Sequence, residues 1–411
     1  MAIINPFKAV RPARDKAGLV ATRPYEEYTS GEITAQLEYN PFSFLHIINP
    51  GYKFQQNVTG EKRFQLVRNR YLEFKEENIF IQDEQACYYI YKVANRSNTY
   101  TGIIAAASIE DYEQNIIRKH EDTLELRENL FKEYLKVVGF NTEPVLLTYP
   151  DSDVINTLID EVMDSRPEYE FSTYNKETHW LWKIEDPTLI NKIQKEFELM
   201  PSIYIADGHH RSASSFLLAK ESRKNNPHHS GKETYNSFMS FLIPESRLEI
   251  YEFSRLIKDL NGWSKEEFLV QLDEWFRIEN RGKEVYYPSK KHHFNMYLEG
   301  EFYSLYLRKT IYQFKNSLSS LDTYILYEKI LKPILGIEDL RSDSRITYVH
   351  GKNDLLEIKT QVDSGKFAVG FGMLPLTIEE IKQVADDGLT MPPKSTYIEP
   401  KLRSGVTIYE F

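Results

Sequence analysis

Apolar and polar residues follow two different periods along this chain, and the periods predict strands interleaved with amphipathic helices. Runs dominated by β-branched and aromatic residues predict strands; they lie at residues 43–48, 63–72, 86–93, 102–107, 145–148, 178–182, 202–206, 238–244, 294–297, 302–307 and 367–372. Runs whose apolar residues recur every three or four positions predict helices; they lie at residues 30–40, 109–117, 123–139, 154–163, 186–197, 212–224, 256–260, 265–275, 322–334 and 377–384. This mixture indicates an α+β (mixed α/β) fold.

The order of these elements suggests three regions, because 411 residues exceed what a single small core usually organises. Residues 1–105 form an N-terminal mixed, β-rich region. Residues 106–225 form a middle region with a long polar insertion at about 150–200, and residues 226–411 form a C-terminal α/β region. We therefore expect a core with large additions at both ends.

The stretch Asp207-Gly-His-His-Arg211 lies between a predicted strand and a predicted helix. Backbone N–H groups and the helix dipole favour an anion at a helix start, and His209, His210 and Arg211 add matching donors. Gly208 lets the backbone turn or approach a ligand closely. Asp207 can cap the helix, bind Mg²⁺ or act as a base. The stretch predicts a phosphate site, the alternative being an ordinary solvated helix start.

A second polar stretch, which contains His120, Glu121 and Thr123, precedes the helix predicted at 123–139. Asp122 and Glu125 have the spacing of a capping box. One face of the helix carries apolar residues, namely Leu126, Leu130, Phe131, Tyr134, Leu135 and Val138. Alone, His-Glu is typical of a solvated turn. Paired in space with Asp207, Glu121 would supply the second carboxylate that a mechanism with a base and a metal requires.

Late in the chain, prolines stiffen the stretch Met391–Lys401 around Lys394, Ser395 and Thr396. A rigid loop that carries a lysine and two hydroxyl groups is a candidate second phosphate clamp. A structural connector is an equally good interpretation of the same spacing.

Composition narrows the class of protein. Hydrophobic residues make up 41% of the chain, which suits a packed core, and the net charge of −10 argues against a nucleic-acid partner. The single cysteine, Cys87, suits a reducing compartment and is expected to be a half-buried, small apolar residue. No apolar run reaches the 18 residues of a membrane span, so we expect a cytoplasmic protein.

The motifs around His120 and Asp207 resemble the superfamily that joins ParB nuclease-like/CTPase domains, sulfiredoxin and the free serine kinases. The resemblance implies a ParB/serine-kinase-like core over residues 106–225. In the serine kinases a strand-turn-helix DGHHR motif accompanies a His-Glu pair whose Glu is the catalytic base. Glu121 and Asp207 occupy the matching positions here.

Over its length the chain resembles the family catalogued as domain of unknown function 1015. Four stretches carry this resemblance: VATRPY at 20–25, IRKHEDT at 117–123, ADGHHR at 206–211 and MPPKSTY at 391–397. The first motif usually continues with Asp, whereas this chain has Glu26. The insertion at 150–200 is also longer than in the serine kinases.

The resemblance implies phosphoryl transfer from ATP or ADP, with Mg²⁺, to a small hydroxylated metabolite such as an amino acid. In this hypothesis Glu121 is the base, Asp207 holds the metal and His209 assists catalysis. The remaining candidates bind nucleotide phosphates, namely Gly208, His210, Arg211, His120, Thr123, Lys394, Ser395 and Thr396. The alternative is a regulatory protein that binds a nucleotide through the same turn without turnover. A ParB-like DNA binder is disfavoured by the negative charge.

Overall fold

The computed structural model describes residues 1–350 and 354–411, which form two units. Unit 1 comprises Met1–Lys119, Thr123–Leu248 and Pro400–Phe411, and unit 2 comprises His120–Asp122 and Glu249–Glu399. Unit 2 is therefore almost wholly one continuous segment between two parts of unit 1. The boundaries predicted at residues 105 and 225 fall inside unit 1, within strand β5 (Thr99–Ser108) and at the end of helix α9 (His209–Asn225).

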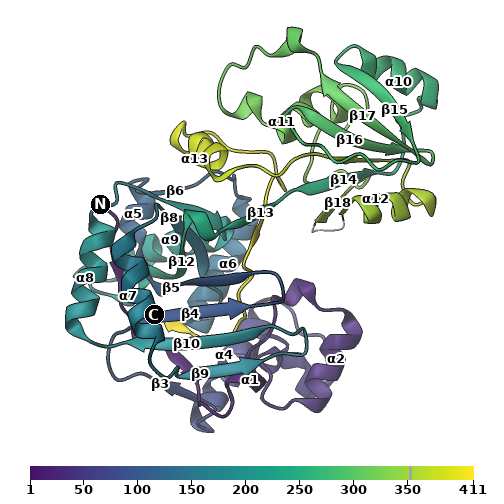
Figure 1. Ribbon diagram of the computed structural model, residues 1–411. Coiled ribbons are helices and arrows are strands. Elements are labelled where there is room, and N and C mark those ends of the chain that lie inside the picture. Colours follow the sequence, from purple (N-terminus) through teal and green to yellow (C-terminus); the bar gives the residue numbers. More distant parts are fainter. Residues whose placement is uncertain (351–353) are drawn as a thin grey trace. The chain divides into compact units, whose positions relative to one another are not determined.

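Unit 1 is built on a large mixed sheet with the strand order β6-β11-β8-β12-β5-β4-β10-β9, and β1 also pairs with β5 (Figure 1). Its strands are β1 (Ile4–Asn5), β4 (Tyr88–Ala94), β5, β6 (Ile117–Arg118), β8 (Val145–Tyr149), β9 (Tyr169–Ser172), β10 (Thr178–Ile184), β11 (Ile203–Asp207) and β12 (Ser237–Pro244). Two small ribbons pair β2 (Val10–Pro12) with β3 (Phe80–Gln82) and β7 (Phe140–Asn141) with β21 (Tyr409–Glu410).

Some helices of unit 1 contact this sheet, and others pack against one another. The helices are α1 (Ala17–Val20), α2 (Ser30–Tyr39), α3 (Leu45–Ile48), α4 (Gly60–Glu76), α5 (Ile109–Glu113), α6 (Glu125–Val138), α7 (Asp153–Met163), α8 (Pro187–Glu198) and α9, with short turns η1 (Tyr25–Glu27), η2 (Pro50–Phe54), η3 (Thr234–Asn236) and η4 (Glu245–Arg247). Helices α7 and α8 lie side by side and bury Ile155, Ile159 and Phe197 in the main core (Figure 1). The segment predicted as an insertion thus contributes β9 and β10 to the sheet.

Three predicted elements have the wrong type. Residues 43–48 and 63–72 were expected as strands, but the chain forms α3 and α4 there. In α4 the buried side chains are Phe64, Val67, Tyr71 and Phe74, whose spacing is that of a helix face rather than alternation. Residues 256–260 were expected as a helix, but their first two residues end strand β14 (Phe253–Ile257). Short apolar runs fit both periods, and pairing with neighbouring strands decides between them.

The N-terminal half of α6 also differs from the prediction. The N-cap is Leu124 and makes no side-chain cap, so the capping box expected from Asp122 and Glu125 does not form. Leu135 and Val138 are buried, whereas Leu126 is 87% exposed. Only the C-terminal half of the predicted apolar face therefore packs into a core.

Unit 2 has its own sheet, in the order β15-β17-β16-β19-β14-β18, and its own apolar cores. Its elements are β13 (Glu249–Tyr251), β14, α10 (Lys265–Asp273), β15 (Phe276–Gly282), β16 (His293–Leu298), β17 (Glu301–Leu307), η5 (Lys309–Ile311), η6 (Leu318–Ser320), α11 (Asp322–Leu326), the π-helical turn η7 (Tyr327–Leu331), β18 (Ile346–His350), α12 (Asp354–Asp363), β19 (Val369–Gly372), α13 (Ile378–Asp386) and β20 (Tyr397–Glu399). Strands β13 and β20 pair with each other, Glu249 opposite Glu399. The chain therefore enters and leaves unit 2 through one two-stranded ribbon.

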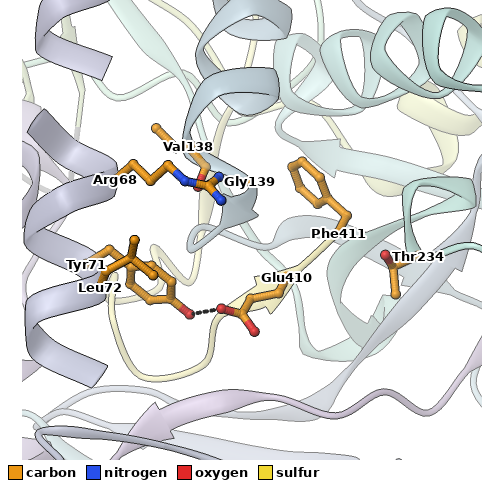
Figure 2. Close-up of a pocket in the computed structure, with 8 residues that line it drawn as sticks. All are labelled: Arg68, Tyr71, Leu72, Val138, Gly139, Thr234, Glu410 and Phe411. Carbon is orange, nitrogen blue, oxygen red and sulfur yellow. Dashed lines mark hydrogen bonds between the residues drawn. The ribbon is translucent and has the colours of Figure 1, made fainter. Parts of the chain in front are cut away.

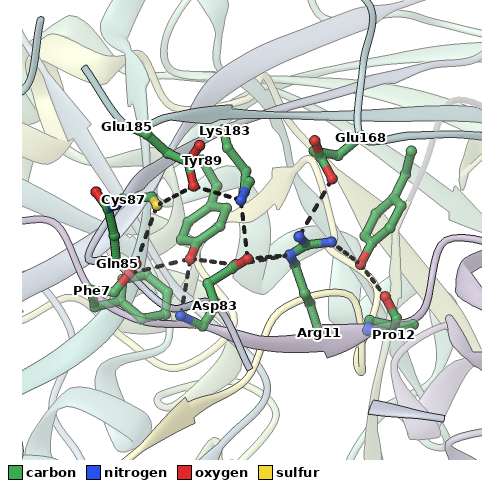
Figure 3. Close-up of polar contacts among 12 residues, drawn as sticks. Phe7, Arg11, Pro12, Asp83, Gln85, Cys87, Tyr89, Glu168, Lys183 and Glu185 are labelled. Atoms are coloured by element: carbon green, nitrogen blue, oxygen red, sulfur yellow. Dashed lines mark hydrogen bonds and ion pairs between the residues drawn. The ribbon is translucent and has the colours of Figure 1, made fainter. Parts of the chain in front are cut away.

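A buried polar network in unit 1 surrounds the cysteine (Figure 3). Arg11 Nε lies 2.8 Å from an Asp83 carboxylate oxygen, which also accepts a hydrogen bond from the Tyr89 hydroxyl at 2.9 Å. The Cys87 thiol lies 3.7 Å from Glu185. Burial, reinforced by the negative charge of Glu185, raises the pKa of Cys87 to about 11. Cys87 is fully buried rather than half-buried as predicted, and the raised pKa keeps its thiol in the protonated, less reactive form.

Candidate functional site

The DGHHR stretch forms the strand-turn-helix that the sequence predicts. Asp207 is the last residue of β11, and α9 begins at His209. Gly208 is the N-cap residue and has φ = +102°, a left-handed conformation that favours glycine. Asp207 is therefore not the helix cap, and its side chain is available for other interactions.

Two parallel strands of unit 1 end at this position. Strand β6 pairs with β11 in parallel, with Ile117 opposite Ile203 and Arg118 opposite Tyr204. Parallel strands present their carboxyl ends at the same edge of a sheet. The chain that follows Arg118 therefore leaves the sheet at the edge where Asp207 lies.

Asp207 is flanked by two cations. One of its oxygens lies 2.8 Å from Arg211 Nη2, and the other lies 3.0 Å from Lys401 Nζ. Arg211 Nη1 lies 3.4 Å from Glu143, whose other oxygen accepts a hydrogen bond from the Ser404 hydroxyl at 3.0 Å. The predicted phosphate-binding arginine is thus engaged in ion pairs within unit 1, while its side chain remains 26% exposed.

Serine hydroxyls stabilise the first turns of α9. Ser212 donates a hydrogen bond to the carbonyl of His209 at 3.0 Å, and Ser214 donates to that of His210. The backbone N–H groups of Arg211 and Ser212 both donate to the Gly208 carbonyl. The first N–H groups of an α-helix have no acceptor within the helix and point towards its start. The start of α9 therefore brings imidazole and guanidinium groups to the positive end of the helix dipole.

His120 and Glu121 group with unit 2. The Met391 amide donates to the His120 carbonyl at 2.9 Å, and Glu121 forms a parallel bridge with Met391. Thr123 belongs to unit 1, where its hydroxyl donates to Glu128 in α6. The proposed pairing of Glu121 with Asp207 remains a prediction.

The predicted second clamp belongs to unit 2. Ser395 is 1% exposed and donates a hydrogen bond to the Pro392 carbonyl at 2.7 Å. Lys394 has φ = +57°, and its Nζ lies 5.1 Å from the centre of the Phe253 ring. The Ser395 hydroxyl is used inside unit 2, which favours the connector interpretation for this residue. Thr396 lies next to it, immediately before β20.

Sequence reasoning missed Glu143, Lys401 and Ser404. Lys401 ends the stretch stiffened by prolines, but nothing in the spacing favours it over Lys394 as a site residue. Its position becomes apparent only because residues 400–411 return to unit 1. Glu143 lies in a short loop between two strands and belongs to no recognisable motif.

The first family motif, at residues 20–25, pairs with the same returning segment, residues 400–411. Thr22 and Ser404 exchange two backbone hydrogen bonds, of 3.1 and 2.9 Å. A few residues on, burial raises the pKa of Glu27, to which neighbouring Glu26 and Glu177 also contribute, while Arg23 and Lys401 oppose the rise. Glu26 itself is exposed on η1.

Unit 1 also contains an open cavity of about 320 Å³ (Figure 2). Its lining residues are Arg68, Tyr71, Leu72, Val138, Gly139, Thr234, Glu410 and Phe411. The Tyr71 hydroxyl donates to Glu410 at 2.7 Å, and Arg68 donates to the carbonyls of Val137 and Val138. None of the site residues predicted from the sequence is among those that line this cavity.

Comparison with known families identifies the chain. Residues 4–324 match the model of a family described as "Protein of unknown function (DUF1015)". The chain belongs to the DUF1015 family. The resemblance expected from the four motifs is confirmed. No curated protein matches the sequence of this DUF1015 protein.

Several solved structures are similar to the DUF1015 protein at low identity. A free serine kinase variant in complex with AMP is 14% identical, covers 74% of this chain and 91% of its own, and has a TM-score of 0.38. SbnI from Staphylococcus aureus is 13% identical, with coverages of 74% and 85% and a TM-score of 0.39. A conserved hypothetical protein from Pyrococcus furiosus is 12% identical, with coverages of 76% and 96% and a TM-score of 0.36.

Across residues 1–350 and 354–411, no helix combines the length and the apolar character that a membrane crossing requires.

Proposed function

We propose that this protein transfers a phosphoryl group from ATP or ADP to a small hydroxylated metabolite. The observation that carries the proposal is the parallel pairing of β6 with β11. Arg118 is opposite Tyr204, and Glu121 and Asp207 follow these paired positions by three residues each along the chain. A base and a phosphate-binding turn at one edge are the parts that phosphoryl transfer requires.

The turn supplies the phosphate-binding groups. His210, Arg211 and the backbone at Gly208 orient and neutralise the phosphates, a task that accounts for most of the catalysis in this reaction class. His120 and Thr123 belong to the same proposed site, with Lys394, Ser395 and Thr396 as a further candidate clamp. His209 is the second candidate for moving a proton at the acceptor.

The donor set at Asp207 fits a hard cation, because its carboxylate offers the oxygen ligands that Mg²⁺ prefers. Both oxygens face cations within unit 1, at 2.8 and 3.0 Å, so Arg211 and Lys401 must move before Asp207 binds a metal. When bound, Mg²⁺ supplies neutralisation of the charge on the phosphates.

Glu121 is proposed as the base that orients and deprotonates the acceptor hydroxyl. The variant Glu121→Gln keeps the size of the side chain but removes its basicity, so turnover should fall by about 100-fold or more. Binding of ADP and Mg²⁺, measured by calorimetry, should change less than about threefold. Loss of nucleotide binding together with turnover would assign Glu121 to the structure instead.

A regulatory nucleotide-binding protein is the second candidate. The ion pairs of Arg211 with Asp207 and Glu143 favour this candidate. They neutralise the charge of the phosphate-binding arginine within the protein, and a protein that only binds and releases a nucleotide needs no catalytic group beyond them. Incubation of the wild-type protein with labelled ATP, Mg²⁺ and a panel of hydroxylated amino acids distinguishes the two candidates. Nucleotide binding without a phosphorylated product across the panel would favour the regulatory function.

A further inference from the structure

Four charged side chains of unit 1 form a continuous series of ion pairs at the end of β11. Lys401 contacts Asp207 at 3.0 Å, Asp207 contacts Arg211 at 2.8 Å, and Arg211 contacts Glu143 at 3.4 Å. The positive charges of Lys401 and Arg211 equal the negative charges of Asp207 and Glu143. The series therefore holds two cations next to the phosphate-binding turn without a net charge.

The backbone on the C-terminal side of Lys401 is firmly held. Arg403 Nη2 donates to Glu177 at 2.8 Å, and its Nε lies 3.0 Å from His179 Nε2. Ser404 is fixed to Thr22 by two backbone hydrogen bonds. The Lys401 side chain is 25% exposed, and a lysine has a flexible four-carbon stem. Its ammonium group can thus change partner while the backbone stays in place.

We propose that Lys401 is a phosphate-binding residue of this site, which Asp207 holds in position until a phosphate arrives. The inference rests on the proposed function and adds a residue to it. On binding, the Lys401 ammonium moves from a carboxylate oxygen to a phosphate oxygen, and Arg211 makes the same exchange. No covalent bond changes. The Asp207 carboxylate, released from both cations, can then accept the metal.

This role differs from a structural one in its effect on stability. Surface ion pairs with partners as exposed as Lys401 and Asp207, at 25% and 36%, contribute little to folding. A variant without the ammonium group should therefore unfold close to the wild-type temperature. Its defect should appear in anion binding and in the response of that binding to salt.

The test compares Lys401→Met, Lys401→Arg and the control Lys220→Met, which removes an exposed lysine on α9. Calorimetry measures the binding of ADP with Mg²⁺ and, separately, of inorganic pyrophosphate, both at several NaCl concentrations. We expect Lys401→Met to weaken both by about 10- to 100-fold and to flatten their salt dependence. Lys401→Arg should recover most of the affinity, and Lys220→Met should bind as the wild type does.

The outcomes separate this inference from the proposed function. Equal binding by the wild type and Lys401→Met would overturn the inference and leave the proposed function standing. Pyrophosphate binding that depends on Lys401, without ADP binding, would support the inference and contradict the proposed function. If the wild type binds neither ligand, both fail. A large drop in melting temperature of Lys401→Met without recovery by Lys401→Arg would assign Lys401 to structure and overturn the inference.

Discussion

At the scale of single residues, Gly208 determines both the backbone conformation of the turn and the space that the Arg211 side chain occupies. Its φ of +102° is strained for any L residue with a side chain, and an added Cβ would lie 3.0 Å from Arg211 Nε. The same residue therefore allows the turn and leaves space for the guanidinium group. The sequence predicted a turn glycine here, but only the structure shows that the space belongs to Arg211.

Gly208→Ala should lower the free energy of unfolding by about 1–2 kcal/mol, because alanine has no favourable left-handed conformation. It should also weaken nucleotide binding, since the new methyl group displaces Arg211. Gly31→Ala is the control: it lies in α2 with open space around it, so it should be neutral or stabilising by about 0.5–1 kcal/mol. Urea unfolding measures the free energy of unfolding of both variants. Equal changes in Gly208→Ala and Gly31→Ala would contradict the special role of the left-handed conformation at Gly208.

His179 gives a residue-scale prediction about pH. Burial, together with the charge of Arg403, lowers its pKa below the ordinary 6.5, although Glu177 opposes the shift. As the pH drops below about 6.5, His179 becomes protonated in the unfolded chain but stays neutral in the folded protein. The free energy of unfolding therefore falls with the pH in this range. His179→Gln should flatten the stability profile between about pH 7.5 and 5, measured by urea unfolding. An unchanged slope would show that folding does not shift the pKa of His179.

At the scale of elements, the sequence predicted β11 and α9 well because each has one clear period and a turn between them. The same reasoning failed for α4, where an aromatic-rich run concealed a helical spacing of buried residues. In α6 the period grouped Leu126 with Leu135, although nine helical residues place these two side chains on opposite sides of the helix, and only Leu135 is buried. Local pattern fixes which residues share a face, and tertiary packing decides what covers it.

Helix α13 allows a direct test of the capping chemistry predicted from sequence. The Thr377 hydroxyl accepts from the Glu380 amide at 3.3 Å, and Glu380 accepts from the Thr377 amide at 3.0 Å. Thr377→Ala removes one half of this capping box and should destabilise unit 2 by about 1 kcal/mol. Thr377→Ser should retain most of the stability. Thermal unfolding of both variants measures the difference, and an Ala variant as stable as Ser would contradict it.

At the scale of the whole molecule, the chain is a unit with a second unit inserted into it. The boundaries predicted at residues 105 and 225 were drawn from the order of the predicted elements along the chain, whereas the structural units depend on contacts between distant segments. Residues 400–411 return to unit 1, where Ser404 pairs with Thr22 and Lys401 contacts Asp207. No local pattern reveals such a return, and for this reason Lys401 and Ser404 could not be predicted as site residues from the sequence.

The ribbon of β13 and β20 predicts that the inserted segment is separable. Because Glu249 and Glu399 are paired, Leu248 and Pro400 lie close enough for a two-residue Asn-Gly turn to replace residues 249–399. The shortened protein should keep the cores of unit 1 and unfold in one cooperative transition by calorimetry. Failure to fold would show that unit 1 depends on the inserted segment. Turnover should be lost in this variant, because it removes Met391, which forms the backbone bridge to Glu121.

A crystal structure of the protein with ADP and Mg²⁺ would show directly whether the turn from Gly208 to Arg211 binds the phosphates of the nucleotide. We expect the phosphates at this turn, with Lys401 moved from Asp207 to a phosphate oxygen and Glu121 facing the same ligand. Phosphates bound elsewhere, for example in the cavity near Arg68, or a Glu121 remote from the nucleotide, would contradict this expectation.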